Sequence, residues 1–133
     1  MSDRTLDRWI AGKIDAAGDE LSVAALQAYQ LARLNETLRR VRSRSPFYRR
    51  HLAHAPDELK ALDELQALPF TTAEDIRREG LQFLCVSQDD IHRIVTLDSS
   101  GTTGAPKRIF FTRDDQELTT DYFHHGMATF TGP

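Results

Sequence analysis

The residue types best suited to chemistry lie together in the stretch Asp98–Lys107, which reads Asp-Ser-Ser-Gly-Thr-Thr-Gly-Ala-Pro-Lys. It holds two glycines, four hydroxyl side chains, one proline and a terminal lysine. Glycine lets a backbone approach a ligand closely, and hydroxyls and backbone N–H groups donate hydrogen bonds. Together with the positive charge of Lys107, this set of donors suits a polyphosphate.

Three other sites built from similar residues do not fit this spacing. A Walker A loop needs a glycine, four residues and then Gly-Lys-Ser/Thr, but Gly101 and Gly104 are too close and Arg108 follows the lysine. A dinucleotide fingerprint needs three glycines and a following helix. Ser99 and Ser100 do not stand in a Gly-x-Ser-x-Gly elbow, and no acid–base partner can be assigned to them. We therefore assign no catalytic residue.

The flanking residues predict a β-hairpin with this loop at its tip. Ile91–Leu97 and Arg108–Thr112 are rich in β-branched and aromatic residues, as strands are. Thr112 or Asp114 is expected to cap a final helix. Residues 91–112 are thus the predicted hairpin, and residues 113–133 are a helix and the end of the chain.

The first ninety residues are predicted to be mostly helical. Apolar residues recur at helical spacing, and serine, threonine, glycine and proline mark the ends of the segments. The expected helices are Leu6–Ala17, Val23–Arg44 capped by Ser22 and ended by Ser45-Pro46, a short helix around Phe47–Leu52, and Ala73–Glu79 capped by Thr72. Leu81–Val86 fits either an extended or a helical conformation.

Composition narrows the class of protein without choosing a function. The 133 residues suffice for one domain, and a net charge of −3 gives no overall attraction to nucleic acid or membrane. Cys85 is the one cysteine, so neither an internal disulfide nor a cysteine metal cluster can form. The sequence has no apolar signal core or spanning run, and we expect a cytoplasmic protein with no membrane partner.

Arginines are dense on and after the long helix, which allows two interpretations. They could bind nucleic acid or another acidic partner, or they could form a solvated helix face offset by nearby acidic residues. We favour the second, because aromatic residues are sparse among them. His51 and His54 lack further ligands at metal-binding spacing, so no metal site is predicted. The arginines are Arg33, Arg39, Arg40, Arg42, Arg44, Arg49 and Arg50.

The stretch Ser99–Lys107 resembles the phosphate-binding signature of the adenylate-forming (AMP-binding) enzyme superfamily. Leu34–Arg50 resembles the N-terminal helical stretch of its phenylacetate–CoA ligase-like branch. Leu68–Thr72 (Leu-Pro-Phe-Thr-Thr), together with Asp75–Arg77 (Asp-Ile-Arg), resembles the next landmark of that branch. The resemblance covers about two-thirds of the chain in the order of the family.

The resemblance implies an ATP-dependent acid–CoA ligase, which activates a small carboxylic acid as an acyl-adenylate and then transfers it to coenzyme A. Its cofactors would be ATP, Mg²⁺ and coenzyme A. His124 and His125 receive no role. The implied contacts to the ATP phosphates are Ser99, Ser100, Gly101, Thr102, Thr103, Gly104 and Lys107.

The implied fold of the whole enzyme is α/β, and residues 1–133 would be the N-terminal portion of its large AMP-binding domain. The closing Gly132-Pro133 is a helix-stop signal, as expected of a fragment, although a natural C-terminus has the same form. We expect such a piece alone to be inactive and to self-associate through exposed apolar surface. The alternatives are a small helical module that binds nucleic acid or protein through residues 33–50, and a relic with only an interaction role. The residues themselves do not show which carboxylic acid is activated or which group accepts the acyl group.

Overall fold

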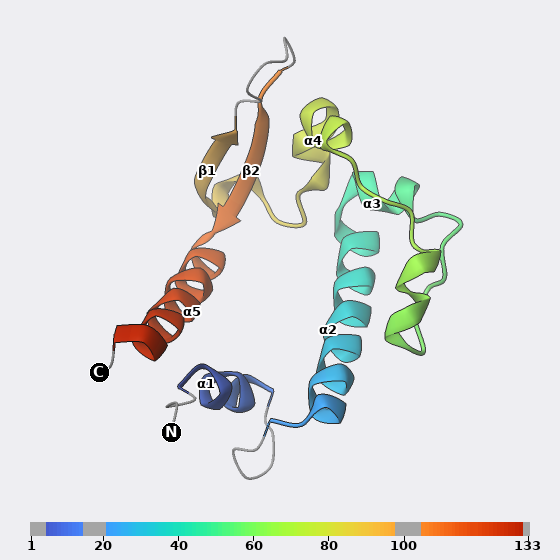
Figure 1. The fold of residues 1–133 in the computed structure, drawn as a ribbon. Coiled ribbons are helices and arrows are strands. Elements are labelled where there is room, and N and C mark those ends of the chain that lie inside the picture. The colour runs from blue at the N-terminus through green and yellow to red at the C-terminus, as the bar shows by residue number, and fades with distance from the viewer. Residues whose placement is uncertain (1–4, 15–20, 98–104, 132–133) are drawn as a thin grey trace.

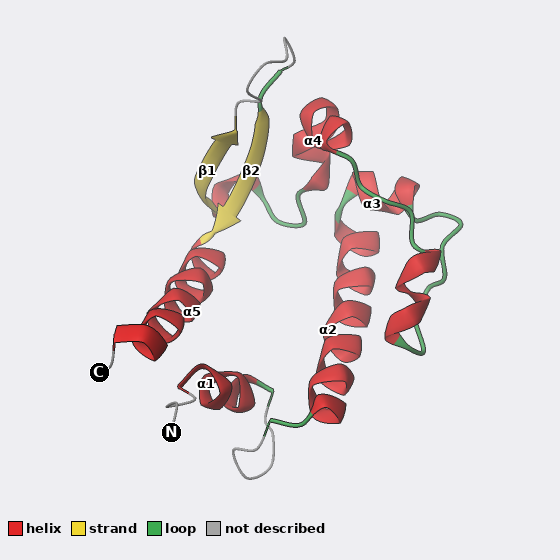
Figure 2. Cartoon of the chain, viewed as in Figure 1, coloured by secondary structure: helices red, strands yellow, loops and turns green. Residues whose placement is uncertain are grey.

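The computed structural model describes residues 5–14, 21–97 and 105–131, and it is mainly helical with one β-hairpin near the C-terminus (Figure 2). This fold class is the one predicted. In chain order the elements are α1 (Thr5–Lys13), α2 (Val23–Arg44), α3 (Pro46–His51), the 3-10 helix η2 (Leu62–Ala67), α4 (Ala73–Glu79), the 3-10 helices η3 (Gly80–Phe83) and η4 (Gln88–Asp90), β1 (Ile91–Leu97), β2 (Lys107–Thr112) and α5 (Arg113–Thr131).

The elements form two arms that meet at α4 and η3 (Figure 1). One arm, here called the α2 arm, contains α2, α3 and η2. The other, the hairpin arm, contains β1, β2 and α5, with α1 packed beside α5. Because α4 and η3 contact both α3 and β2, they fix the position of the hairpin relative to α2.

Local caps set the limits of the α2 arm. The Ser22 side chain accepts a hydrogen bond from the Ala25 N–H, and Ser45 caps α3 by accepting one from the Tyr48 N–H. Ser45 is fully buried, and its hydroxyl also donates to the Gln82 carbonyl oxygen over 2.9 Å. The predicted start and end of the long helix are confirmed. Both limits are set locally, because the Ser22 cap directly precedes the helix and Ser45-Pro46 directly follows it.

The buried core is small and belongs mostly to the α2 arm. Leu38, Leu52 and Leu59 form its centre, while the Phe47 and Phe83 rings stack with centroids 3.9 Å apart where α3 meets η3. Leu81–Val86, for which the sequence left two conformations open, begins within η3 and continues without regular structure. This turn brings Phe83 back onto α3.

The hairpin is antiparallel, with Leu97 paired to Lys107 at one end and Ile91 paired to Thr112 at the other. The register shifts between Ile91 and Arg93. The second strand begins at Lys107, one residue before the predicted start. Both predicted strands are otherwise confirmed, because their β-branched and aromatic residues suit a pleated ribbon.

The start of α5 is fixed by a reciprocal cap. The Thr112 hydroxyl accepts a hydrogen bond from the Asp115 N–H, and the Asp115 carboxylate accepts from the Thr112 N–H over 2.8 Å. Of the two predicted caps, Thr112 is therefore correct. None of the described helices is both long and apolar enough to cross a membrane.

Candidate functional site

Of the seven predicted phosphate contacts, only Lys107 is among the residues that the structure describes. It is half-buried as the first residue of β2 and is paired with Leu97. Ser99, Ser100, Gly101, Thr102, Thr103 and Gly104 lie outside the described residues. The hairpin nevertheless fixes both attachment points of the loop, since Leu97 and Lys107 are neighbours across the ladder.

The described end of the loop borders a cavity of about 470 Å³ beside α4. Ala105 and Pro106 line one side, and residues 76–82 with Arg108 and Phe110 line the rest. In this wall the Arg77 guanidinium forms an ion pair of 3.4 Å with Glu74, while its buried Nε–H has no hydrogen-bond partner within the described ranges. The cavity therefore places arginine donors beside Ala105 and Pro106, and neighbouring carboxylates offset part of the arginine charge.

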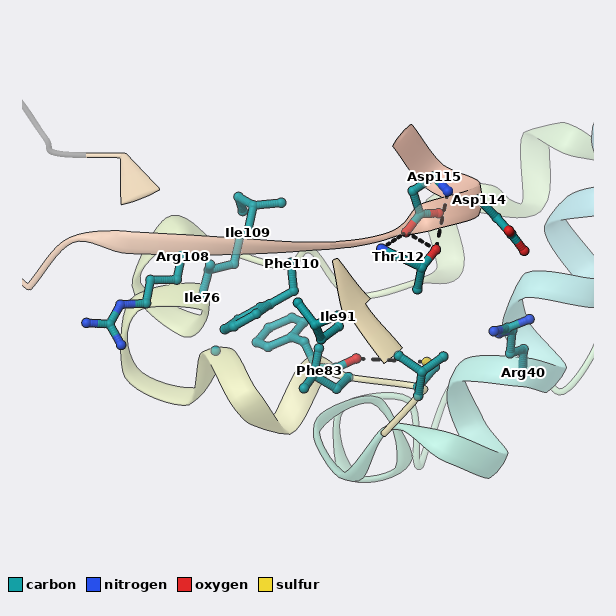
Figure 3. Close-up of a pocket in the computed structure, with 14 residues that line it drawn as sticks. Arg40, Ile76, Phe83, Ile91, Arg108, Ile109, Phe110, Thr112, Asp114 and Asp115 are labelled. Atoms are coloured by element: carbon teal, nitrogen blue, oxygen red, sulfur yellow. Dashed lines mark hydrogen bonds between the residues drawn. The ribbon is translucent and has the colours of Figure 1, made fainter. Parts of the chain in front are cut away.

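A second cavity, of about 500 Å³, lies between the two arms (Figure 3). Its apolar walls come from α4, η3 and both strands, and include Ile76, Phe83, Ile91 and Phe110. Arg40 reaches it from α2. Sequence reasoning did not find this cavity, because its walls come from separate elements and no local motif records their meeting.

Most of the dense arginines have structural partners. Arg42 donates to the carbonyl oxygens of Ala55 and Pro56 and forms an ion pair with Asp57 at 3.3 Å. Arg49 donates to the Ser43 carbonyl oxygen. Arg33 and Arg50 form ion pairs with Glu36 and Glu79. The Arg49 and Arg50 contacts join α3 to α2 and α4, and the Arg42 contacts join α2 to the segment after α3.

The histidines on α3 and α5 also have local contacts. The His51 ring stacks on Phe47 and its Nε2 lies 3.0 Å from the Phe70 carbonyl oxygen. His125 Nε2 lies 3.4 Å from the Asp121 carboxylate, whereas His124 is exposed. Across residues 5–14, 21–97 and 105–131, no three side chains of the metal-binding types come together.

The Asp121 carboxylate joins α1 to α5 and was not singled out in the sequence. It accepts a hydrogen bond of 2.9 Å from the Trp9 indole N–H and lies 3.3 Å from the Lys13 ammonium. The indole hydrogen bond, followed by the Lys13 and His125 charges, holds the pKa of Asp121 below its ordinary value. The Trp9 contact makes α1 part of the hairpin arm.

The thiol of Cys85 lines the cavity of Figure 3 and is half-buried. Burial raises its pKa, although the charges of Arg40 and Arg44 act in the opposite direction. A raised pKa keeps the thiol protonated near neutral pH, so the nucleophilic thiolate is scarce. Cys85 thus contributes its thiol to the wall of the cavity.

The sequence matches no protein-family profile. It is 36% identical over 98 residues to the phenylacetate–coenzyme A ligase of Pseudomonas putida, and 37% identical over 98 residues to that of Escherichia coli K12. A third such ligase, from Thermus thermophilus, is 32% identical over 107 residues. The chain is distantly homologous to the phenylacetate–coenzyme A ligases.

The matches to these ligases cover 71–77% of this chain but only 22–24% of the length of the ligases themselves. The relationship confirms the resemblance that was read from the loop and its upstream landmarks. The relationship involves more than the loop, since the match extends over 98 residues and the loop has only ten.

Proposed function

We propose that this chain is the N-terminal, phosphate-binding portion of an ATP-dependent ligase that joins a small carboxylic acid to coenzyme A through an acyl-adenylate. The identity to the phenylacetate–coenzyme A ligases over most of the chain is the observation that carries this proposal. The composition of Ser99–Lys107 supports it, as does the hairpin that anchors both ends of that stretch.

In this proposal the chain contributes binding and charge neutralisation. The hydroxyls of Ser99, Ser100, Thr102 and Thr103 would donate hydrogen bonds to phosphate oxygens, and Gly101 and Gly104 would allow the backbone to come close. The Lys107 ammonium would offset the charge that develops on the departing pyrophosphate. Mg²⁺, when bound with ATP, would neutralise further phosphate charge.

Lys107 lies at a position suited to that role. Its backbone is held in β2 by the pairing with Leu97, so its ammonium is tethered next to the loop. Arg108 follows on the same strand and is exposed at the edge of the cavities beside α4. A cation attached through its backbone at the base of a donor-rich loop can reach a phosphate held there and offset the charge that develops on it.

A chimera tests the proposal in a complete enzyme. The segment of the Escherichia coli ligase that matches this chain would be replaced by the corresponding residues, and CoA-ester formation would be measured with ATP, Mg²⁺ and a panel of carboxylic acids. We expect activity, and a loss of about 100-fold in kcat/KM for Lys107→Ala, the size associated with removing one transition-state contact. Lys60→Ala, which changes an exposed lysine outside the loop, is the control.

A correctly folded chimera in which Lys107→Ala and Lys60→Ala are equally active would overturn the assigned role of the loop. The 133-residue chain is tested separately, by pyrophosphate release under the same conditions. We expect it to remain at background, because its matches span under a quarter of the relatives' length. Robust turnover by the chain alone would contradict that expectation.

A further inference from the structure

The cavity of Figure 3 has the size and walls of a small-molecule site. Its volume of about 500 Å³ falls in the range of ligand pockets. Phe83, Val86, Ile91 and Phe110 line it with apolar side chains, to which Ile76 of α4 adds. These side chains come from η3, the segment after it and both strands, so the apolar part is shared by several elements (Figure 3).

One end of this cavity carries two opposite charges from different arms. Arg40 extends from α2, Asp114 extends from the first turn of α5, and in Figure 3 the two side chains point toward each other. Both residues are exposed, and neither forms an ion pair with the other or with any further residue in the described ranges. The neighbouring Asp115 differs, because the cap with Thr112 occupies its carboxylate.

We propose that this cavity binds an apolar α-amino acid. The carboxylate would lie against the Arg40 guanidinium, the ammonium against the Asp114 carboxylate, and the side chain along the apolar wall. A guanidinium can donate two parallel hydrogen bonds to a carboxylate, which fixes its orientation. A zwitterion fits best, because its two adjacent charges can pair with both protein groups, whereas a singly charged ligand can pair with only one of them.

The opposite end of the cavity restricts the side chain of the ligand. Arg108 lies there, away from Arg40, and is exposed without an ion-pair partner among the described residues (Figure 3). Its charge disfavours a basic ligand side chain, while the Phe83 and Phe110 rings favour an aromatic or large aliphatic one. The site is separate from the proposed phosphate contacts and does not depend on their function.

The test uses the isotopically labelled 133-residue chain and three matched probes in an NMR titration. L-Phenylalanine carries both charges, 3-phenylpropionate lacks the ammonium and 2-phenylethylamine lacks the carboxylate. We expect phenylalanine to shift the backbone signals of Phe83, Ile91 and Phe110 with a Kd on the order of 1 mM. Each analogue should bind about tenfold more weakly, since each can make only one of the two charged contacts.

Two variants and two controls assign the charges. Arg40→Gln should weaken phenylalanine binding about tenfold while leaving phenylethylamine binding unchanged, and Asp114→Asn should weaken phenylalanine while leaving phenylpropionate unchanged. Arg39→Gln alters the adjacent exposed arginine, which does not line this cavity, and should have no effect. Lys107→Ala should also have no effect, which separates this site from the phosphate loop.

Three results would overturn the proposal. One is the absence of shifts at the cavity residues with phenylalanine. Another is equal affinity for the three probes, which would mean that the two charges are not used. The third is an equal loss of affinity in Arg40→Gln and Arg39→Gln. A circular dichroism spectrum matching the parent establishes that each variant is folded.

Discussion

The Asn35 side chain ties the middle of α2 to the segment that follows α3. Its amide nitrogen donates to the Leu59 carbonyl oxygen over 2.8 Å, and its carbonyl oxygen accepts from the Leu59 N–H over 2.9 Å. Both residues are buried, so water cannot replace either bond. The amide therefore satisfies the backbone of a residue at the centre of the core.

Asn35→Leu should destabilise the chain by about 2–4 kcal/mol, because it leaves two buried backbone groups of Leu59 unpaired. The midpoint of urea unfolding, followed by circular dichroism, measures the change. Gln27→Leu, at an exposed position of the same helix, should shift the midpoint little. Equal midpoints for the two variants would show that the amide contributes no more than a surface residue.

Asp75 gives the N-terminus of α4 a pH-dependent contribution to stability. Its carboxylate accepts hydrogen bonds from the Thr72 hydroxyl and the Thr72 N–H, at 2.7 and 2.9 Å. These bonds, with further help from the Arg78 and His51 charges, lower the pKa of Asp75 below its ordinary value of 3.8. A lowered folded-state pKa means that the stabilisation is full above the ordinary value and is lost as the pH falls through the folded one.

The free energy of unfolding should therefore differ most between the parent and Asp75→Asn above pH 4, and the difference should shrink as the pH falls below 3.8. Urea unfolding at several pH values measures it. Asp63→Asn, at an exposed residue of η2, is the matched control and should give a small difference. A pH-independent difference for Asp75→Asn would contradict the assignment.

At the scale of single residues, the sequence predicts contacts between residues that are close together in the chain. The caps at Ser22, Thr72 and Thr112 could be predicted because the hydroxyl and the N–H that it accepts from lie three residues apart. The partners of Asn35 and Asp121 could not, since Leu59 and Trp9 are distant in the chain. Lys107 was predicted from its motif, whereas no motif marks Arg40 as part of a cavity.

Among the elements, α1 is joined to α5 by contacts between distant parts of the chain. The Trp9 ring packs edge-on against Tyr122 with centroids 5.7 Å apart, while its N–H is held by Asp121. Lys13 lies over the Trp9 ring and also pairs with Asp121. Helical spacing in the sequence could not show which helix Trp9 packs against, because Tyr122 and Asp121 are distant in the chain.

Asp121→Asn should loosen α1 from α5, because an amide binds the Trp9 N–H and the Lys13 ammonium less strongly than a carboxylate does. Trp9 is the one tryptophan of the sequence, so its fluorescence reports this contact directly. We expect emission at longer wavelength and greater quenching by acrylamide. Glu117→Gln, an exposed neighbour on α5, should leave both unchanged, and an unchanged spectrum in Asp121→Asn would show that α1 is held by other contacts.

The molecule as a whole has a small buried core and exposes many large apolar side chains. Most of the buried side chains lie in the α2 arm, whereas α5 exposes Phe123, Met127 and Phe130. These three residues lie at spacings of four and three, and therefore share one face of the helix. Amphipathic spacing predicted that α5 is a helix, but it could not predict which apolar residues remain exposed, because that depends on the open arrangement of the two arms.

We propose that copies of the chain associate through this face of α5, where Phe123 is 61% and Phe130 87% exposed. Burying two such rings removes apolar area from water, which favours association at high concentration. Sedimentation equilibrium over about a hundredfold range of concentration should give a mass that rises above the 15.1 kDa of one chain.

Phe123→Ser with Phe130→Ser should lower that mass toward one chain. Phe70→Ser removes a ring that is 92% exposed in the other arm and should leave the mass unchanged. A parent chain of constant 15.1 kDa, or an equal effect of Phe70→Ser, would contradict association through α5.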